Sequence, residues 1–459
     1  MPCDAIVVGG GIAGLCAAFE LGRKGRDVLL FESENEAGGN VRTAARDGFL
    51  LERGPHAFLG SADQLFALVD GLGIGDRLAP ARPAAARRYI VRDGVPREVP
   101  GGPWSFLTTG LLGPCAKLRL AAEPLFTGRG SPDDTASTFF ARRFGREAAR
   151  ILAGAFVNGV YAGDPDRLSA PAAFPLFWRF EQEHGGMIRG GMAHARARRR
   201  QHRLAGTPLH RGLFSFEGGL GTLTRALAGH LGPRCRMGSR VTAVVPRRDG
   251  PGYAVSVSGE THAARAVIVA APPAAASDLV SGLDRDLAKT LAGFRMAPVA
   301  TVQLGYGKRL SSVPEAFGAL APAGHGTRAL GVLFPSRIFG DRTPPDGDLL
   351  NVFLGGVNDA AALDLDDAAL TDLATGEVRK LFGVDAPCDF AQVDRYPAAI
   401  PQLELGHLDR MAGIEARLAA RPGLRLAGNY LTGVGIKDAV ASGFAAATRI
   451  DSFLSGGGA

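Results

Sequence analysis

The chain has 459 residues, 46% hydrophobic and 21% charged, with a net charge of +7, a composition typical of a folded protein of two or three domains. Its five cysteines form no C-x-x-C pair and no Cys/His cluster, which argues against a disulfide framework and a metal site and favours a reducing cytoplasm. No apolar run reaches the roughly 18 residues of a membrane span and no signal peptide is recognisable, so we expect any membrane contact to be peripheral.

The first element predicted along the chain is a dinucleotide-binding βαβ unit. An apolar strand over 5–8 runs into G-x-G-x-x-G, a helix follows, and a second strand over 27–32 ends in Glu32. Glu32 follows the middle glycine at the spacing that brings a carboxylate to a ribose 2′-OH. A 2′-phosphate would be repelled there, so NAD and FAD are both compatible with this unit. The residues expected at the phosphates are Gly9, Gly11, Ile12, Ala13 and Gly14.

A second glycine-rich turn, EAGGNVRT, follows this unit directly. Its paired glycines let the backbone approach a pyrophosphate again, which makes Gly38, Gly39 and Arg42 candidate cofactor residues. From about 62 to 205 a helical pattern is broken by turns and ends in the arginine-rich run 194–203. No aromatic residue interleaves with these arginines, which argues against nucleic acid and leaves a solvated face or an anionic partner.

The C-terminal half returns to an α/β pattern. A glycine-rich turn and a helix over 214–231 precede three strands between 240 and 273, and 290–400 mixes strands and helices. A buried strand over 424–429 then runs into GNYLTGVGIKDAVASG (428–443), a second phosphate-type loop followed by an amphipathic helix. The chain therefore carries two such loops more than four hundred residues apart.

This order predicts an α/β fold with one Rossmann-like nucleotide-binding domain built from discontinuous segments. A substrate region is inserted between those segments. The expected boundaries are 1–84, 213–285 and 400–459 for the nucleotide-binding domain, 206–212 and 286–399 for a mixed α+β substrate-binding domain, and 85–205 for a mostly helical insert.

Two groups of motifs carry a family resemblance. The glycine fingerprint, DGFLLERGPHAFL (47–59) and LAGNYLTGVGIKDAVASG (426–443) together resemble the flavin amine oxidase-like superfamily. RRYIVRDGVPREVP (87–100), NGVYAGDPDRLS (158–169) and AIPQLELGH (399–407) are similar to the oxygen-dependent protoporphyrinogen oxidase family. The resemblance spans nearly the whole chain. It implies oxidation of protoporphyrinogen IX to protoporphyrin IX in haem biosynthesis, with molecular oxygen as acceptor and hydrogen peroxide as product.

The resemblance also implies one FAD stretched between the two glycine loops. The N-terminal fingerprint would hold the pyrophosphate and Glu32 the adenosine ribose. A helix beginning near Gly435 would direct its positive end at the flavin N1/C2 carbonyl, where negative charge gathers upon reduction. Further cofactor residues implied by the family are Gly54, Pro55, His56, Val241, Gly428, Val434, Gly435 and Ile436.

The tetrapyrrole site follows from the resemblance as well. Arg88 matches a position that pairs with a substrate propionate, which suits a bidentate guanidinium. Leu320 and Phe339 match apolar positions that sandwich the macrocycle, and the carbonyl of Gly159 would face the pyrrole N–H groups. His56 stands where some members carry arginine, and we expect it, like His407, to be a structural histidine.

The helical insert would correspond to the membrane-facing region of the family. FPLFWRF (174–180) and the arginine-rich run suit peripheral binding to anionic lipid. Such binding would release an insoluble product toward the membrane or a downstream chelatase.

Several alternatives stay open. Some bacterial relatives oxidise coproporphyrinogen III, which has four propionates in place of two, and the sequence does not separate the two substrates. A quinone could replace oxygen as acceptor. A more distant alternative is an amine oxidase or a carotenoid desaturase. An amine oxidase usually has a lysine near the flavin, and Lys437 is the only candidate for it. A flavin-binding scaffold without turnover belongs to a different class, and prompt reoxidation of dithionite-reduced protein in air would argue against it.

Overall fold

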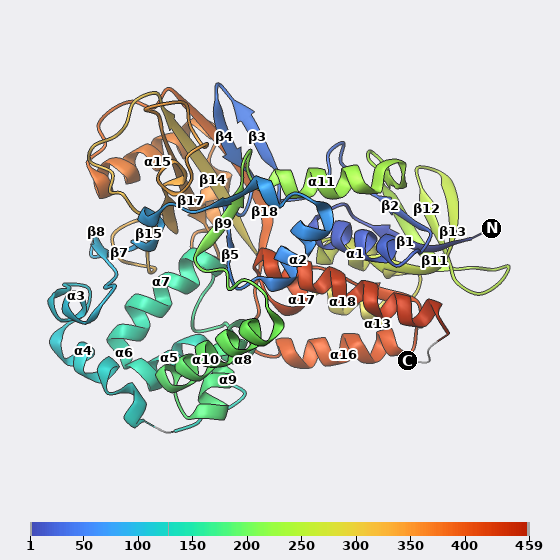
Figure 1. Cartoon of the computed structure of the whole chain (residues 1–459), viewed down its shortest axis with the longest axis horizontal. Coiled ribbons are helices and arrows are strands. Elements are labelled where there is room, and N and C mark those ends of the chain that lie inside the picture. The colour runs from blue at the N-terminus through green and yellow to red at the C-terminus, as the bar shows by residue number, and fades with distance from the viewer. Residues whose placement is uncertain (1, 127, 457–459) are drawn as a thin grey trace.

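The computed structural model describes residues 2–126 and 128–456. Two seven-stranded sheets lie side by side, and a group of helices lies beneath the second sheet (Figure 1). The first sheet has the order β10-β2-β1-β13-β12-β11, with β19 also paired to β13. Its strands are β1 (Cys3–Val8), β2 (Val28–Phe31), β10 (Cys235–Arg236), β11 (Val241–Pro246), β12 (Tyr253–Val257), β13 (Glu260–Val269) and β19 (Leu424–Leu426).

The first sheet is covered by helices on both faces, as its apolar strands require. In β1, Val7 pairs in parallel with Leu30 on one side and Ile268 on the other, and all three are buried or nearly so. One face packs on α1 (Ile12–Arg23), α2 (Asp63–Leu72), α11 (Gly221–Leu231) and α18 (Ile436–Leu454). The other packs on α12 (Pro273–Val280), α13 (Arg285–Ala292) and α16 (His407–Ala419).

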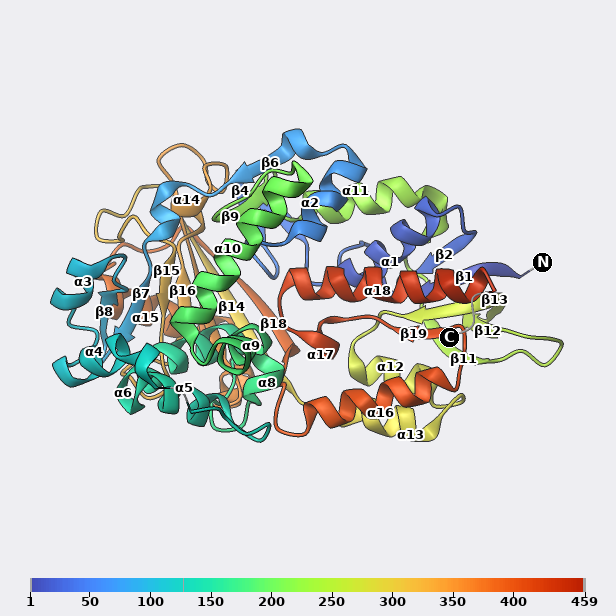
Figure 2. The same cartoon turned by 60° about the horizontal axis from the view of Figure 1, so that its bottom comes forward.

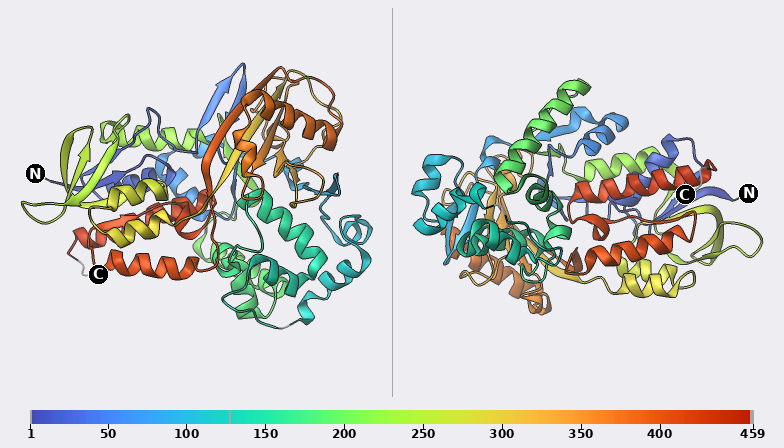
Figure 3. Two further views of the ribbon diagram at one scale, coloured as in Figure 1. Left: turned by 180° about the vertical axis from the view of Figure 1, so that it is seen from behind. Right: turned by 90° about the horizontal axis from the view of Figure 1, so that it is seen from below.

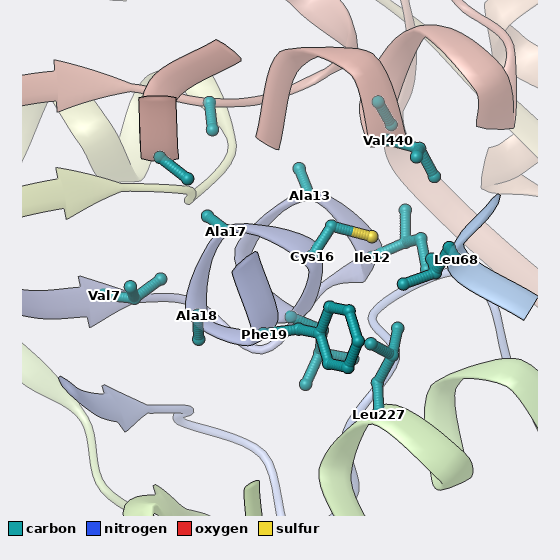
Figure 4. Packing of buried hydrophobic residues seen from close by; sticks show 14 of the residues in the cluster. Val7, Ile12, Ala13, Cys16, Ala17, Ala18, Phe19, Leu68, Leu227 and Val440 are labelled. Carbon is teal, nitrogen blue, oxygen red and sulfur yellow. The ribbon is translucent and has the colours of Figure 1, made fainter. Parts of the chain in front are cut away.

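The helices α1 and α18 come from opposite ends of the chain and pack closely together (Figures 2 and 4). Gly443 of α18 lies so near that a Cβ there would be 2.2 Å from the carbonyl oxygen of Ala13. Further along, Asp451 forms salt bridges to Lys24 and Arg26, which follow α1. The two helices therefore run parallel, and both begin at the same end of the sheet.

The second sheet has the order β18-β14-β17-β16-β15-β7-β8. Its outer face carries Ala300, Val302, Leu304, Val352 and Leu354, which form one apolar core with α15 (Asp367–Phe382). The alternate residues of the same strands face the rest of the molecule. The strands are β7 (Tyr89–Arg92), β8 (Val95–Glu98), β14 (Met296–Tyr306), β15 (Gly318–Leu320), β16 (Gly331–Leu333), β17 (Asp348–Gly355) and β18 (Phe390–Pro401).

The helical layer begins at Pro103, later than expected. The hairpin β7–β8 lies within the stretch 85–205 that the sequence assigns to the helical insert, yet β7 pairs with β15 and extends the second sheet. One long helical stretch, 146–161, contains two π-helical segments, η4 (Ala149–Ala153) and η5 (Val157–Tyr161). The other helices of this layer are α3 (Pro103–Thr108), α4 (Pro114–Ala121), α5 (Ala136–Phe144), α6 (Arg146–Ala148), α7 (Gly154–Phe156), α8 (Ala170–Ala173), α9 (Pro175–His184) and α10 (Met187–Ala205).

Short elements connect these layers, and both chain ends lie at the far end of the first sheet (Figure 3). Within the described ranges no helix is long and apolar enough to cross a membrane. The remaining strands are β3 (Thr43–Arg46), β4 (Phe49–Glu52), β5 (Phe58–Leu59), β6 (Leu78–Pro80) and β9 (Leu213–Phe216), and the remaining helices are α14 (Pro335–Ile338), α17 (Asn429–Thr432) and the 3₁₀ turns η1 (Gly75–Arg77), η2 (Pro83–Ala86), η3 (Glu123–Leu125), η6 (Gly232–Arg234) and η7 (Ala360–Asp364).

Candidate functional site

The N-terminal glycine loop forms an open cradle at the start of α1. Gly9 has a φ of +106°, and a Cβ at Gly14 would be 2.0 Å from the Gly9 carbonyl oxygen, so neither position accepts a side chain. Beside Gly11, by contrast, no atom lies within 4 Å of a Cβ position. The amides of Gly11 and Ala13 donate to no acceptor in the described part of the chain. Free N–H groups at a helix N-terminus beside open space fit a phosphate.

Glu32 directly follows β2 and lies next to this cradle. Its Oε2 accepts the Gly10 N–H at 2.5 Å, and its Oε1 accepts the Glu34 N–H at 2.8 Å, so the carboxylate is held in place by the loop itself. Val241 begins β11 close by, because the Ser239 N–H donates to the Glu32 carbonyl at 2.7 Å. The structure thus brings together the residues expected at the adenosine end of FAD.

The second glycine turn lies directly against the first. The Gly38 N–H donates to the Gly10 carbonyl at 2.7 Å, and Gly11 and Gly38 form an isolated parallel bridge. A Cβ at Gly39 would be 3.2 Å from the Cα of Gly11. Arg42 follows this turn, and its buried Nε has no hydrogen-bond partner among the described residues. The paired glycines therefore face the same open space as the fingerprint.

The C-terminal loop reaches the same end of the molecule but extends further. Gly443, which packs on Ala13, lies two turns inside α18, whereas Ala13 lies in the first turn of α1. At 1.5 Å per residue, α18 begins roughly 9 Å beyond the start of α1 in the same direction. The amides of Val434 and Ile436 donate to no acceptor in the described chain. Two helix N-termini staggered in this way suit one elongated ligand with acceptors along its length.

The segment 52–56 crosses between the two sheets and is fixed by three side chains of the second one. Gln303 donates from Nε2 to the Glu52 carbonyl at 3.2 Å, Tyr396 donates to the Arg53 carbonyl, and Asn351 Nδ2 lies 2.8 Å from His56 Nε2. The three come from the adjacent strands β14, β18 and β17. This contact places Gly54, Pro55 and His56 over the inner face of the second sheet.

Burial sets the charges at this contact. Burial and the neighbouring Arg342 lower the pKa of His56 to about 3, so the imidazole is neutral at physiological pH. Burial raises the pKa of Glu52 to about 6, although Thr43 donates to Oε2 at 2.7 Å and the Leu220 N–H donates to Oε1 at 2.8 Å. His56 therefore acts as a hydrogen-bonding group and not as a cation, as the sequence-based expectation of a structural histidine requires.

The inner face of the second sheet presents a glycine-floored strip. Gly331 pairs with Leu320 of β15 on one side and with Phe353 of β17 on the other, so all three side-chain positions point to the same face. Leu320 and Phe353 are half-buried and rise on either side of the glycine. This strip lies between the helical stretch 146–161 and the segment 52–56, and its side chains are apolar.

Gly159 meets this strip at the end of the helical layer. A Cβ on Gly159 would be 2.5 Å from Cδ2 of Leu320, so any side chain here would displace Leu320. The helix ends three residues later at Ala162, whose φ of +46° is a conformation that side chains rarely adopt. The Val357 N–H donates to the Ala162 carbonyl at 2.9 Å and holds this turn. Strain of this kind is typical of functional segments.

Three motifs quoted from the sequence converge here. Gln402 donates from Nε2 to the Tyr161 carbonyl at 2.8 Å, which joins the AIPQ segment to the GVYAG segment. Val434 of the C-terminal glycine loop packs against the apolar cluster that contains Tyr161 and Leu403. Segments near positions 160, 402 and 434 thus form one contiguous wall.

Two expected substrate residues lie further out. Arg88 directly precedes β7, is exposed, and has its guanidinium carbon 5.5 Å from the ring centre of Phe317. Phe339 is only 2% exposed and packs with Ala85 and Ile338, under Arg342, and does not share the strip with Leu320. The half-buried aromatic side chain opposite Leu320 is Phe353 instead.

Sequence reasoning missed Gln303, Asn351 and Phe353. These residues lie in segments that were predicted to be strands. They alternate there with the apolar residues Val302, Val352 and Leu354, and this alternation could have shown that they face the other side of the sheet. Which face they point to depends on pairing between strands far apart in sequence. Among the described residues, no group of three or more His, Cys, Asp or Glu side chains is arranged to hold a metal ion.

These features fit FAD. Two staggered cradles with free amides and a fixed carboxylate beside the first cradle suit its pyrophosphate, ribityl chain and adenosine ribose. The fit to FAD rests on the free backbone amides in both cradles.

Comparisons with known proteins agree with this site. Residues 12–451 match the model of the flavin containing amine oxidoreductases. The chain is 32% identical to the chloroplastic protoporphyrinogen oxidase of Oryza sativa subsp. japonica, over 98% of this chain and 88% of the relative. It is 28% identical to the coproporphyrinogen III oxidase of Bacillus subtilis, over 98% of both chains. A solved structure from Exiguobacterium sp. 255-15, provisionally named a protoporphyrinogen oxidase, superposes with a TM-score of 0.82 over 99% of both chains at 24% identity, which shows a shared fold.

Proposed function

The chain belongs to the flavin-containing amine oxidoreductases and, within them, to the protoporphyrinogen oxidase family, and from that premise we propose that it oxidises protoporphyrinogen IX to protoporphyrin IX with FAD and molecular oxygen. The reaction removes six electrons and six protons from the substrate, and three molecules of oxygen become three of hydrogen peroxide. When bound, FAD would supply the hydride acceptor and the route of electrons to oxygen, and the residues of this chain would bind and orient the substrate.

One observation carries this proposal. The GVYAG segment reaches the glycine-floored strip at Leu320 and, through Tyr161, the wall formed with Val434 of the C-terminal cofactor loop. A flat substrate on the strip would therefore lie beside the far end of an elongated cofactor. An amine would need neither the strip nor this contact, and Lys437 is exposed on the first turn of α18.

We assign the cofactor roles by segment. The discontinuous domain 1–84, 213–285 and 400–459 would bind FAD, with amides of both helix N-termini as donors and Glu32 as ribose acceptor. The fingerprint residues would lie at the pyrophosphate, while Val241 would lie at the adenine and His56 near the ring system. The cofactor set is Gly9, Gly11, Ile12, Ala13, Gly14, Glu32, Gly38, Gly39, Arg42, Gly54, Pro55, His56, Val241, Gly428, Val434, Gly435 and Ile436.

The substrate roles follow from the second sheet. Leu320 and Phe353 would flank the macrocycle, the Gly159 carbonyl would accept hydrogen bonds from pyrrole N–H groups, and Arg88 would bind a propionate. The buried position of the strip between 146–161 and 52–56 would exclude water while the substrate is bound. Phe339 packs in the same apolar cluster as Phe317, and Phe317 lies beside Arg88. Phe339 would therefore support the Arg88 end of the substrate site from the core.

Coproporphyrinogen III is the second candidate substrate, because relatives named coproporphyrinogen III oxidase match almost the whole chain. The two substrates differ by two propionates, so the discriminating contact is electrostatic. We offer chemically reduced protoporphyrinogen IX and coproporphyrinogen III separately, and follow porphyrin fluorescence and peroxide together. Faster product from protoporphyrinogen supports the proposal, whereas preference for coproporphyrinogen moves the chain to the alternative. No product from either substrate, with FAD bound, contradicts both.

We also propose that the helical insert binds an anionic membrane surface. Of the stretch 174–180, Phe174 and Phe180 are buried in the insert's own core, so this stretch is less available than the sequence suggests. The most exposed apolar side chains are Trp104 and Leu125, at 77% and 78%, with Leu107 and Leu118 between them in the chain. The N-terminal end of α10 donates to Glu123 near Leu125, whereas its arginine-rich end lies at Gly60 and Asp63, so the helix would link apolar and basic ends of one anionic-lipid interface.

Liposome flotation tests the membrane proposal. Full-length protein should float with anionic vesicles and not with neutral ones, and Trp104→Ala with Leu107→Ala should reduce flotation severalfold. Replacing Arg196, Arg199 and Arg200 by glutamine should do the same, whereas Arg285→Gln on the exposed face of α13 serves as the charge control. Unchanged flotation of both insert variants would contradict the proposal.

A further inference from the structure

The carboxylate of Asp438 lies under the C-terminal glycine loop, in a position that the proposed function does not use. Asp438 is the third residue of α18, and its Oδ2 accepts the Gly435 N–H at 3.0 Å. A Cβ on Gly433 would be 2.6 Å from the same oxygen. The carboxylate is thus enclosed by the loop 433–435, immediately behind the free amides of Val434 and Ile436.

Asp438 makes no close salt bridge among the described residues. Burial raises its pKa, which indicates that the carboxylate lies in a medium less polar than water, while the adjacent, exposed Lys437 is the cation that acts on the carboxylate and lowers its pKa. Tyr161 faces it from the helical insert, and Asp63 of α2, which lines the same cavity of about 280 Å³, is already paired with Arg198. An unpaired charge in such a medium acts strongly on its neighbours.

We propose that Asp438 sets the reduction potential of the bound FAD, by placing a negative charge behind the helix N-terminus that faces the flavin ring. The free amides of α18 favour negative charge in front of them, and the macrodipole adds to this effect. Asp438 opposes both, because reduction of the cofactor adds negative charge on the same side. The inference rests on the proposed FAD site, and it names a residue that tunes that site without touching substrate.

A helix N-terminus both orders a cofactor loop and attracts negative charge, and Asp438 opposes only the second of these effects. An acidic residue in the first turn stabilises α18, and the bond to Gly435 fixes the loop. The same charge lowers the affinity of the site for electrons. The protein therefore holds a well-ordered cofactor loop whose potential is lower than its amides alone would give, which favours transfer of electrons onward to oxygen.

The test is the midpoint potential of the FAD-loaded protein, measured by equilibration with a reference dye. Asp438→Asn keeps an oxygen for the Gly435 N–H and removes the charge, so the loop should keep its geometry. The expected result is a shift to a more positive potential, on the order of tenfold in the reduction equilibrium, or about 30 mV for a two-electron couple. Asp438→Ser retains an acceptor with a shorter reach and should shift in the same direction.

Asp451→Asn is the matched control, because Asp451 lies on the same helix four turns away and is paired with Lys24 and Arg26. Its potential should equal that of the unmodified protein. Lys437→Gln should shift the potential in the opposite direction, and by less, because Lys437 is exposed. An unchanged potential in Asp438→Asn, or an equal shift in Asp451→Asn, would overturn the inference.

The outcome is distinguishable from failure of the proposed function. If the unmodified protein binds no FAD, the cofactor proposal fails before any variant is compared. If it binds FAD but oxidises neither porphyrinogen, the substrate proposal fails while the potentials of the variants can still be compared. A shift confined to Asp438 variants supports the inference whether or not the FAD-loaded protein oxidises a porphyrinogen.

Discussion

Two adjacent arginines at the start of β7 point in opposite directions, and only one of them belongs to the proposed site. Arg87 is bound to Glu98 on the neighbouring strand at 2.7 Å, which ties it to the outer side of the hairpin. Arg88 has no carboxylate partner among the described residues and lies beside Phe317 instead. Strand alternation thus leaves one guanidinium free for a ligand.

Arg88→Gln should raise the KM for a porphyrinogen by roughly 10- to 100-fold, because a charge-assisted hydrogen bond contributes about 1.5–3 kcal/mol. The value of kcat should change less, since the propionate is remote from the reacting carbon. Arg87→Gln is the matched control and should leave KM unchanged. Steady-state fluorescence kinetics measure both variants, and an equal rise in KM for the two would contradict the role of Arg88.

The buried, neutral His56 should lower the free energy of unfolding in acid. Its pKa is about 3 in the fold and 6.5 in an unfolded chain, so the unfolded chain binds the proton first as the pH falls below 6.5. Stability is therefore fully present above pH 6.5 and is lost progressively toward pH 3. Between pH 6.5 and 5 this amounts to about 2 kcal/mol. Urea denaturation at pH 7 and pH 5 measures it.

His56→Asn should remove most of that acid sensitivity while keeping a hydrogen bond to Asn351. Glu52 works in the opposite direction: its pKa is raised to about 6, so its contribution favours the fold at low pH and declines as the pH rises from 4.5 to 6. The free energy of unfolding of Glu52→Gln should therefore compare best with that of the unmodified protein at neutral pH, where the buried Glu52 carboxylate is ionised. Because the two contributions oppose each other, the comparison is between variants: equal acid sensitivity of His56→Asn and the unmodified protein would contradict the assignment for His56.

At the scale of elements, the contact between α1 and α18 decides where the two cofactor loops lie. The contact is made by small residues, with Gly443 against the backbone of Ala13; Figure 4 labels Ala13 of α1 and Val440 of α18 in the shared core. The stagger of the two helix N-termini follows from this one point of closest approach and from the salt bridges of Asp451. Moving the helices apart would change the distance between the loops.

Gly443→Ala should destabilise the protein by roughly 1–3 kcal/mol, because the added methyl group meets backbone and not a flexible side chain. FAD affinity should fall with it, since the two cradles would separate. Gly229→Ala, in the exposed part of α11 with no atom near its Cβ position, should be neutral or stabilising by up to about 1 kcal/mol. Urea midpoints and flavin fluorescence measure both, and equal effects would contradict the packing argument.

At the scale of the whole molecule, the second sheet holds the segment 52–56 of the first module in place. Gln303 is fully buried, and its amide donates to the Glu52 carbonyl. Gln303→Leu should leave that carbonyl unsatisfied and cost about 1–3 kcal/mol. Gln392→Leu, on the same face but bonded only to the Val393 carbonyl, should cost much less. Urea midpoints of the FAD-free proteins test this, and equal losses would contradict a link between the modules.

Much of the first module could be predicted from the sequence. The fingerprint, the helix after it and the strand before Glu32 were predicted correctly because a βαβ unit is local: its period, its glycines and its acid all lie within about thirty residues. The C-terminal loop before α18 was predicted for the same reason. The family was recognisable because these local motifs occur together.

The site itself depended on contacts between distant segments. The hairpin β7–β8 was expected in a helical insert and instead joins the second sheet, because only pairing with β15 decides where a short strand belongs. Leu320 and Phe339 were expected on the two faces of the macrocycle, and Phe339 is almost fully buried in a separate cluster; an apolar residue looks the same in sequence whether it lines a site or fills a core. Phe353 takes the place opposite Leu320 through a register that links β15, β16 and β17.

The sequence by itself determined that the chain carries two phosphate-type loops, an acid for a ribose and the motifs of a flavin-dependent porphyrinogen oxidase, because each of these is written in consecutive residues. Only the tertiary structure decided that the loops point the same way, that α18 begins beyond α1, and that Gly159 meets Leu320. Relative positions of this kind arise from packing between elements up to four hundred residues apart, and close-packed contacts are not encoded in any local period.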